Sequence, residues 1–196
     1  ECPQKYKFSY IDKIKEPPSW QMYLGSFVHE VLEHLYKQPA DQRNNETLKE
    51  LAAKLWAENN WPRKIEELPE MLGSLGDFKR SAFEAMTNLW ALEDPSMVEL
   101  DHMELEISTS IDGVQLFGIV DRIASDPDGS VVISDYKTGK IPDPRFNSDD
   151  QKWFQLLLYA AMYEATTGKL AKRLEYFYLA KSIKHELEVS DEKLQI

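Results

Sequence analysis

Two aspartates and a lysine in the stretch 118–140, GIVDRIASDPDGSVVISDYKTGK, have the types and spacing to support chemistry. Asp121 follows one short apolar run, and Asp135 and Lys137 follow the next. Side chains alternate along a strand, so Asp135 and Lys137 are expected to share a face. Each carboxylate raises the proton affinity of the other, and one lysine cannot neutralise both. A divalent cation would neutralise them, so the pattern indicates a metal site.

The segment between the two apolar runs determines whether Asp121 comes near that face. Residues 126–129, DPDG, have the composition of a tight turn. A hairpin built on this turn would bring Asp121 close to Asp135 and Lys137. In the alternative interpretation, Asp135 and Lys137 form an ordinary surface pair on an edge strand, where charged residues are common. The spacing alone leaves both interpretations open.

Composition bounds the class of protein. The chain has 196 residues, 42% of them hydrophobic, which fits one domain with a substantial core and argues against disorder. No apolar run approaches the roughly 20 residues of a membrane helix, and no signal peptide is visible. A single cysteine rules out a disulfide framework and favours the cytoplasm. The net charge of −11 argues against nucleic-acid binding by bulk charge, but leaves room for a local groove where metal ions and a few cations meet phosphates.

The two ends of the chain have distinct patterns. Cys2 to Ile14 interleaves aromatic and basic residues, which fits either an amphipathic packing segment or a basic lip beside a nucleic-acid groove. The chain opens without an initiator Met, and 190–196 has the signals of a helix start that is cut short. We therefore expect both termini to be incomplete.

Hydrophobic periodicity predicts helices in the first half of the chain. The predicted segments are Trp20 to Tyr36, Glu46 to Asn59, and Ile65 to Leu92, the last interrupted near Gly73 and Gly76. In the first of these, Gly25, His29 and Glu33 recur every fourth position along one face. A glycine inside a helix costs about 1 kcal/mol relative to alanine, so Gly25 suggests close approach of another group. Taken alone, His29 fits a hydrogen-bonded histidine at the edge of the core as well as it fits a metal ligand.

The second half of the chain has the alternation of strands. Met103 to Ile111 alternates strictly, and Asp112-Gly113 is a strong two-residue hairpin signal. Three successive antiparallel strands are therefore expected to end at Lys137. The later elements expected are an apolar helix from 148–150 to Ala165 and strands at Arg173 to Ala180 and His185 to Val189. A helix that crosses between strands predicts a mixed sheet with helices on its faces.

Four short motifs occur in a fixed order, on a helix, a strand, a strand and a helix. They are GSFVH with Gly25 and His29, GIVD ending at Asp121, DYK with Asp135 and Lys137, and QLLLY with Gln155 and Tyr159. This order resembles the PD-(D/E)xK nuclease superfamily, and within it the RecB-type exonucleases, which include the CRISPR-associated RecB-like exonucleases. The similarity covers nearly the whole chain, and VDRI followed by SDYKTG is its most specific portion.

The resemblance implies an architecture and an activity. The fold would be α/β (α+β), with a restriction-endonuclease-like core whose central mixed sheet is flanked by helices. One nuclease domain would span 1–196, with a mainly helical subdomain at 1–100 and the sheet-containing catalytic core at 101–196. The activity would be that of a metal-dependent DNA exonuclease in repair, recombination or CRISPR-related DNA processing, acting on single strands or duplex ends. Helicases and repair or CRISPR proteins would be its protein partners, and no membrane is implied.

The resemblance also implies roles for individual residues. The metal ligands would be His29, Asp121, Asp135 and the backbone carbonyl of Tyr136. Lys137 would orient the attacking water or stabilise charge on the phosphate, and Gln155 and Tyr159 would line the site and steady the substrate or Lys137. Together with Asp121 and Asp135, these three are the expected catalytic residues. Such a donor set suits Mg²⁺ or Mn²⁺. Glu33 and Glu106 are weaker candidates, expected behind the ligands or in solvent.

Two departures limit the resemblance. Several relatives hold an iron–sulfur cluster on four cysteines; Cys2 matches the first position, but the chain has no other cysteine. No cluster is therefore expected, and Cys2 would be a packing residue. The chain also lacks a GxxxxGK[ST] phosphate loop and hence a helicase motor. A catalytically silent nuclease-like module, serving DNA binding or assembly in a larger repair complex, is the alternative function. The intact Asp121, Asp135 and Lys137 favour the enzyme.

Overall fold

The computed structural model describes residues 4, 7–14, 16–143 and 149–189. Its main elements are the π-helix η1 (Lys7–Ile11), helices α2 (Trp20–Tyr36), α3 (Asn45–Glu58), α4 (Trp61–Glu66) and α5 (Leu75–Thr87), strands β1 (Glu99–Ile111), β2 (Val114–Ser125) and β3 (Val131–Lys137), helix α6 (Asp149–Thr167), and strands β4 (Ala171–Tyr178) and β5 (Ile183–Glu188). This order matches the predicted one of helices, three strands, a helix and two strands.

The interruption predicted near Gly73 within the helical segment Ile65 to Leu92 is present, and it is longer than the glycines alone indicated. Helix α4 ends at Glu66, and α5 begins only at Leu75. Ser74 starts α5 with a capping box, because its side chain accepts the Asp77 N–H while the Asp77 carboxylate accepts the Ser74 N–H. The glycines therefore indicated where the two helices separate, but not that the non-helical segment begins at Glu67.

The five strands form one mixed sheet in the order β1-β2-β3-β4-β5. All neighbours are antiparallel except β3 and β4, which run parallel and are connected through α6. The mixed sheet predicted from the crossover helix is confirmed. Strand β3 lies in the centre of the sheet and Asp135 is buried, so the interpretation of Asp135 and Lys137 as an edge-strand surface pair is wrong.

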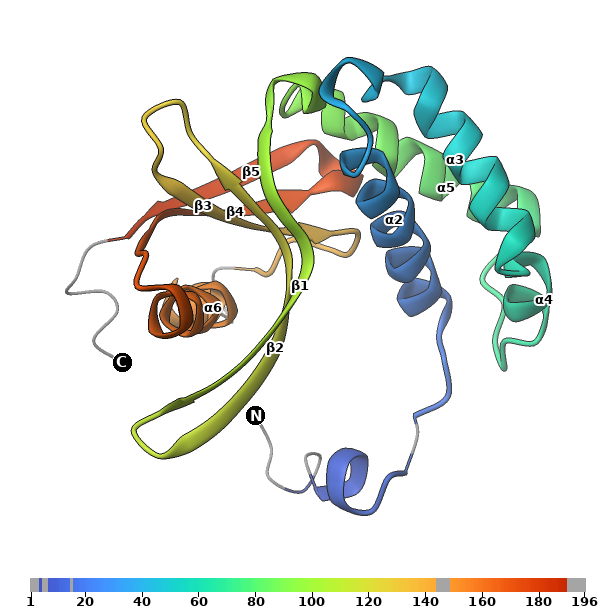
Figure 1. Cartoon of the computed structure of the whole chain (residues 1–196). Coiled ribbons are helices and arrows are strands. Elements are labelled where there is room, and N and C mark those ends of the chain that lie inside the picture. Colours follow the sequence, from blue (N-terminus) through green and yellow to red (C-terminus); the bar gives the residue numbers. More distant parts are fainter. Residues whose placement is uncertain (1–3, 5–6, 15, 144–148, 190–196) are drawn as a thin grey trace.

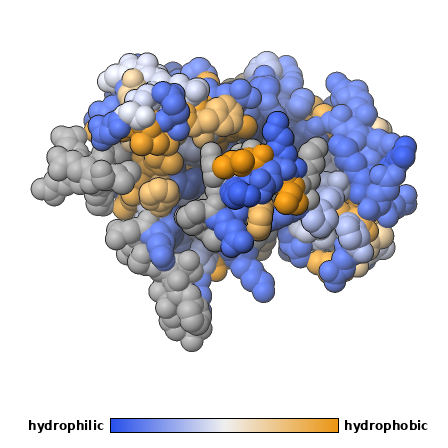
Figure 2. Space-filling model, turned by 90° about the horizontal axis from the view of Figure 1, so that it is seen from below, coloured by the Kyte–Doolittle hydropathy of each residue, from blue (hydrophilic) through white to orange (hydrophobic). Residues whose placement is uncertain are grey.

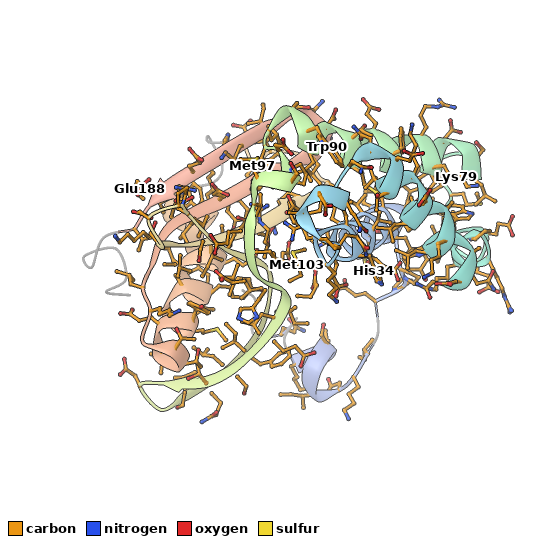
Figure 3. All side chains as sticks on the ribbon, turned by 45° about the horizontal axis from the view of Figure 1, so that its top comes forward. His34, Lys79, Trp90, Met97, Met103 and Glu188 are labelled. Atoms are coloured by element: carbon orange, nitrogen blue, oxygen red, sulfur yellow. The ribbon has the colours of Figure 1, made fainter. Side chains whose placement is uncertain are left out.

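Helices cover both faces of the sheet (Figure 1). Helix α6 packs on one face, where Leu156 and Ala160 meet Ile123 and Ile133 of the strands. Helices α2, α3 and α5 form the second layer, and their core reaches Tyr136 of the sheet. Met103 of β1 also packs against this helical core (Figure 3). The layer of α2, α3 and α5 thus stands over the strand ends that carry the DYK motif.

Strands β1 and β2 form a long curved arm. Its turn residues, Asp112 and Gly113, have φ values of 50° and 79°, the left-handed pair that a two-residue hairpin requires. The pairing runs from Ile111 and Val114 at the tip back to the sheet. Strand β2 pairs with β3 only over 122–125, so the rest of the arm projects past α6 (Figure 1).

The N-terminal segment does not pack as an amphipathic element would. Phe8, Ile11 and Ile14 are all exposed, which contradicts the packing interpretation for these residues. Figure 2, seen from below, shows apolar patches within a largely hydrophilic surface on this side of the molecule. Cys2, expected to pack, lies outside the described residues. In the described ranges, no helix combines the length and apolar character needed to cross a membrane.

Candidate active site

The candidate site forms where β2 and β3 separate. Arg122 and Ser134 are the last paired residues of these strands, and Asp121 and Asp135 come next. The backbone N–H of Tyr136 lies beyond this last pair and donates to Asp121 Oδ2 at 2.9 Å. The carboxylate therefore occupies the fork between the strands and satisfies a buried backbone donor.

His29 of α2 reaches this fork from the helical layer. Its Nε2 lies 2.7 Å from the Tyr136 carbonyl oxygen, and its Nδ1 lies 3.4 Å from Asp121 Oδ2. Burial disfavours the imidazolium, but the carboxylates of Glu104 and Asp121 outweigh burial and raise the pKa of His29 to about 9. His29 is thus held between the end of β3 and the Asp121 carboxylate.

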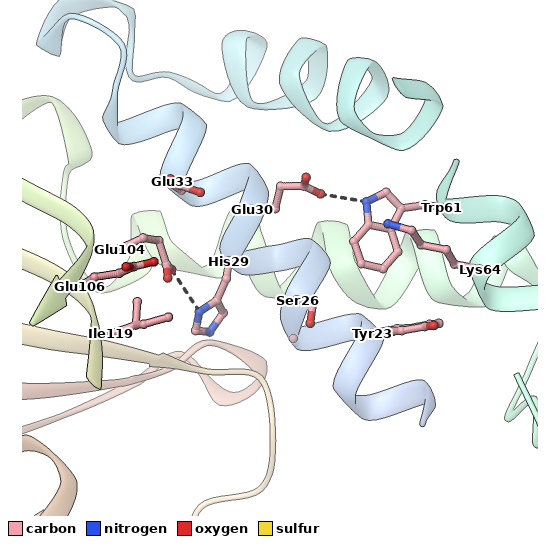
Figure 4. Close-up of a pocket in the computed structure, with 11 residues that line it drawn as sticks. Tyr23, Ser26, His29, Glu30, Glu33, Trp61, Lys64, Glu104, Glu106 and Ile119 are labelled. Atoms are coloured by element: carbon pink, nitrogen blue, oxygen red, sulfur yellow. Dashed lines mark hydrogen bonds and ion pairs between the residues drawn. The ribbon is translucent and has the colours of Figure 1, made fainter. Parts of the chain in front are cut away.

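Glu104 of β1 is the site residue that the sequence analysis missed. Its Oε1 lies 3.8 Å from His29 Nδ1, as Figure 4 shows. Among the described residues, His29, Glu104 and Asp121 form the one group of three side chains whose ligand atoms could share a cation, all lying within 4.8 Å of one another. The φ of Glu104 is 49°, an uncommon conformation for a non-glycine residue.

A signal for Glu104 was present in the sequence. The Asp112-Gly113 turn pairs Ile111 with Val114, and counting back along both strands places Glu104 opposite Asp121. Its flanking pairs, Met103 with Arg122 and Leu105 with Val120, follow this register. The sequence analysis named Glu106 and Glu33 instead. Both line the same cavity as His29, but neither belongs to the group of three.

Asp135 and Lys137 lie on the same face, as predicted from alternation. Lys137 Nζ is 2.7 Å from Asp135 Oδ2 and also donates to Gln155 Oε1 at 3.1 Å. The Gln155 amide in turn donates to the Tyr159 hydroxyl at 3.2 Å. The two polar residues of α6, one helical turn apart, therefore anchor the lysine at the end of β3.

Two motif glycines allow the walls of the site to approach. A Cβ on Gly118 would lie 2.7 Å from Cε1 of Tyr159, closer than real side chains come. A Cβ on Gly25 would lie 3.3 Å from Thr138 Oγ1, just beyond the DYK motif. Gly118 therefore lets α6 bring Tyr159 against the arm, and Gly25 lets α2 bring His29 against the end of β3.

The site carries more buried negative charge than its own cations neutralise. Burial, and then the neighbouring charge of Asp135, raise the pKa of Asp121 to about 7. Burial also raises the pKa of Asp135, although Lys137 opposes this effect. Asp135 Oδ2 is buried, and the Lys137 ammonium 2.7 Å away is its ion-pair partner. Two neighbouring buried carboxylates beside an imidazole fit a hard divalent cation.

A cavity of about 770 Å³ opens from this cluster (Figure 4). His29, Glu104 and Glu106 line one end, together with Ile119 of β2. Trp61 lines the other end, where its Nε1 donates to Glu30 at 2.8 Å. The cavity runs between α2 and the β1–β2 arm and reaches the cluster through His29 and Glu104, whereas Asp121 and Asp135 lie buried behind them.

Comparison with known proteins places this geometry in a family. The profile of the PD-(D/E)XK nuclease superfamily matches residues 1–195. A solved structure of a candidate exonuclease from Eubacterium rectale superposes with a TM-score of 0.56 at 13% identity, covering 97% of this chain and 67% of that one. No curated protein matches. The mixed sheet flanked by helices is a restriction-endonuclease-like α+β fold, and the chain belongs to the PD-(D/E)XK nuclease superfamily.

Proposed function

We propose that the protein is a metal-dependent deoxyribonuclease that removes nucleotides from DNA ends by hydrolysing phosphodiester bonds. The observation that carries this proposal is the buried pair Asp121 and Asp135 beside His29 and Lys137, a surplus of negative charge next to the cavity that His29 and Glu104 line. The family and the order of the four motifs support the nuclease activity. A RecB-type exonuclease of the cytoplasm, working with repair, CRISPR or helicase proteins on DNA, is the finer form of the proposal.

The residues that would hold the metal ion are His29, Asp121, Asp135 and the Tyr136 carbonyl, with Glu104 added to the expected set. His29 Nε2 donates a hydrogen bond to the Tyr136 oxygen at 2.7 Å, so the ring would have to release this proton to hold an ion together with that oxygen. The oxygen-rich set suits Mg²⁺ or Mn²⁺, and the imidazole favours Mn²⁺. When bound, the ion would lower the pKa of water and offset charge on the phosphate.

The remaining steps belong to the chain itself. The Lys137 ammonium would donate to the attacking water or to a non-bridging phosphate oxygen, where charge develops in the transition state. Gln155 and Tyr159 would keep that ammonium aimed at the fork, because the amide links the ammonium to the hydroxyl. The helical layer over the strand ends would exclude bulk water and strengthen these interactions.

The test is cleavage of end-labelled DNA with Mg²⁺, Mn²⁺ or EDTA. We expect metal-dependent release of nucleotides by the wild-type protein and loss of that release in Asp121→Asn. Titration calorimetry with Mn²⁺ on the Asp121→Ala, Asp135→Ala double variant should show lost binding. A wild-type protein that binds DNA and Mn²⁺ without cleaving DNA would instead support the silent DNA-binding module.

A further inference from the structure

A buried aromatic ring of β4 lies under the ammonium of Lys137. Lys137 Nζ is 5.3 Å from the centroid of the Tyr176 ring. This distance lies within the roughly 6 Å at which the negative face of an aromatic ring attracts a cation. The parallel register pairs Tyr176 with Asp135 of β3, so the ring stands beside both charged groups of the DYK motif. Tyr176 belongs to none of the four sequence motifs.

The packing of the sheet and α6 fixes this ring in place. Tyr176 is only 3% exposed. Trp153 of α6 stacks on it with the ring centroids 5.2 Å apart and an angle of 28° between the planes. Tyr178, two residues further along β4, packs against it at a centroid distance of 6.0 Å. Because Trp153 and Tyr178 are buried as well, Tyr176 is a rigid wall of the site.

The polar contacts of Lys137 are less permanent than this wall. Its ammonium lies 2.7 Å from Asp135 Oδ2 and 3.1 Å from Gln155 Oε1. Gln155 is exposed, so water competes for its amide oxygen. Asp135 is an expected metal ligand, and a divalent ion held there would share the carboxylate with the ammonium and repel it. The ring is not among the expected ligands, so its attraction for the ammonium would remain.

A lysine needs such a fixed contact to act as an oriented donor. Its ammonium sits on a flexible four-carbon stem, and holding that stem in one geometry costs conformational entropy. A rigid neighbouring ring reduces the number of geometries open to the stem before substrate arrives. The gain from such pre-orientation appears in the rate of the chemical step and not in the affinity for substrate.

We propose that Tyr176 is a positioning residue of the nuclease, whose ring holds the Lys137 ammonium at the end of β3. This inference rests on the proposed function and adds to the same site a residue that acts through Lys137. Burial keeps Tyr176 itself away from the substrate. The face of the ring should therefore matter, whereas the hydroxyl should not.

The first experiment measures kcat and KM for DNA cleavage by the full chain with Mn²⁺. Tyr176→Phe keeps the ring and should cut like the wild type. Tyr176→Leu keeps an apolar side chain but removes the ring, so kcat should fall about tenfold with KM nearly unchanged. An equal loss in Tyr176→Phe would assign the effect to the hydroxyl and overturn the inference.

Two comparisons separate positioning from a general loss of packing. Phe177, the next residue of β4, is also buried, and its ring lies 4.9 Å from the Arg122 guanidinium on the opposite face of the sheet. Phe177→Leu should lower stability in urea and leave kcat unchanged. The Tyr176→Leu, Lys137→Ala double variant should cut no more slowly than Lys137→Ala alone, because the ring then has nothing to position. Losses that multiply, or an equal fall of kcat in Phe177→Leu, would overturn the inference.

A readout without cleavage keeps the inference distinct from the proposed function. Nuclear magnetic resonance of the Lys137 side chain, in EDTA and with Mg²⁺, detects the ring current of Tyr176 on the methylene protons beside the ammonium. The displaced signal should persist in Tyr176→Phe and return to the position of an exposed lysine in Tyr176→Leu, under both conditions. A signal that Tyr176→Leu does not move would overturn the inference. A wild-type protein that cleaves nothing but shows the displaced signal would remove the nuclease activity and still support Tyr176 as the residue that places the ammonium.

Discussion

Two adjacent residues of β2, Asp121 and Arg122, belong to two buried polar clusters that differ in their balance of charge. Asp121 belongs to the candidate site, whereas Arg122 belongs to a cluster on the other side of the strand with Glu93, Ser134 and Glu175. The Arg122 guanidinium donates to Ser134 at 3.1 Å, to Glu175 at 3.4 Å and to both carboxylate oxygens of Glu93. In this second cluster each carboxylate meets a cation.

The pKa values of the carboxyl groups in the two clusters are shifted in opposite directions. Burial would raise the pKa of Glu175, but Arg122, Lys184 and Arg173 outweigh burial and lower it. For Asp121 burial wins, because a second carboxylate stands beside it. The carboxylates of the Arg122 cluster are therefore neutralised without a ligand, whereas the candidate site needs a cation to reach the same charge balance. Removing one charged side chain should therefore destabilise the folded protein when it comes from the Arg122 cluster. It should leave the metal-free protein equally or more stable when it comes from the candidate site.

The largest expected effect is the loss of Arg122. Arg122→Met should lower the free energy of unfolding by about 3–5 kcal/mol, because it leaves Glu93 without its cation and removes one of the three cations around buried Glu175. Asp121→Asn, the matched change one residue away, should leave the metal-free protein equally stable or more stable. Urea unfolding in EDTA measures both. Equal losses in the two variants would mean that the clusters do not differ in this way.

The next effect concerns the lysines of the two clusters. Lys137→Ala should lower turnover by on the order of 10²-fold or more while the protein stays folded, as for loss of one electrostatic stabiliser. Lys137→Arg should rescue poorly, because a planar fork does not replace a compact ammonium. Lys184, which donates to Glu175 at 3.3 Å, is the control, and Lys184→Ala should leave turnover unchanged.

Single-turnover cleavage of a labelled oligonucleotide with saturating Mn²⁺ makes this comparison. Binding of Mn²⁺ and of DNA, measured on the same Lys137→Ala preparation, should match the wild type. A Lys137→Ala protein that cuts within a fewfold of the wild type would exclude this lysine from the chemistry.

A smaller effect tests how α6 reaches the site. Gly118→Ala should cost about 1–3 kcal/mol of stability by overpacking, because the new Cβ meets the Tyr159 ring. Turnover should fall as well, since Tyr159 supports Gln155 and Lys137. Gly139→Ala is the control, because a Cβ at Gly139 meets nothing within 4 Å.

Removing the ring should separate the two effects of Gly118→Ala. The Gly118→Ala, Tyr159→Ala double variant should recover stability without recovering turnover, a coupling that a double-mutant cycle measures. Additive losses of stability would show that Gly118 matters for a reason other than its contact with Tyr159.

The sequence predicted the fold better than it predicted the contents of the two clusters. Alternation, the Asp112-Gly113 turn and the crossover helix were sufficient for the mixed sheet, because these signals are local. The sequence motifs also located the residues that the structure gathers around Asp121, and their catalytic roles stay predictions. The position of Glu104 was missed because two glutamates share the polar face of β1, and only the register chooses between them.

Sequence patterns did not predict the Arg122 cluster, for a different reason. Arg122 stands next to Asp121 in the VDRI motif, and nothing local shows that it turns into the core. Its partners Glu93 and Glu175 are supplied by segments 29 and 53 residues away. Pairings at such separations follow from the complete packing of sheet and helices. The break before Ser74 was predicted from Gly73 and Gly76, but its start at Glu67 was not, because Gly73 lies at its other end.

The smallest effect is the pH dependence of stability in the metal-free protein. The pKa shifts in the two clusters determine whether stability rises or falls with pH. The pKa of Asp121 is raised from 3.8 to about 7. Between pH 3.8 and about 7, the folded state therefore keeps a proton on Asp121 that the unfolded state has already released. The free energy of unfolding falls as pH rises through this range. The pKa of His29 is raised from 6.5 to about 9, so its contribution is also lost as pH rises, in the next window. Glu175, whose pKa is lowered from 4.5, loses its contribution only in acid and stays silent above pH 5.

Urea unfolding in EDTA from pH 5 to pH 9 should therefore show a continuous decline, with a slope of at most about 1.4 kcal/mol per pH unit for each proton released. Asp121→Asn should flatten the decline below pH 7 and keep it above, where His29 titrates. Saturating Mn²⁺ should stabilise the protein increasingly as pH rises, because the ion takes deprotonated ligands and displaces the protons they hold. A metal-free protein whose stability rises from pH 5 to pH 7 would place the dominant titration in a neutralised cluster like that of Arg122, and would remove the electrostatic argument for a cation at Asp121.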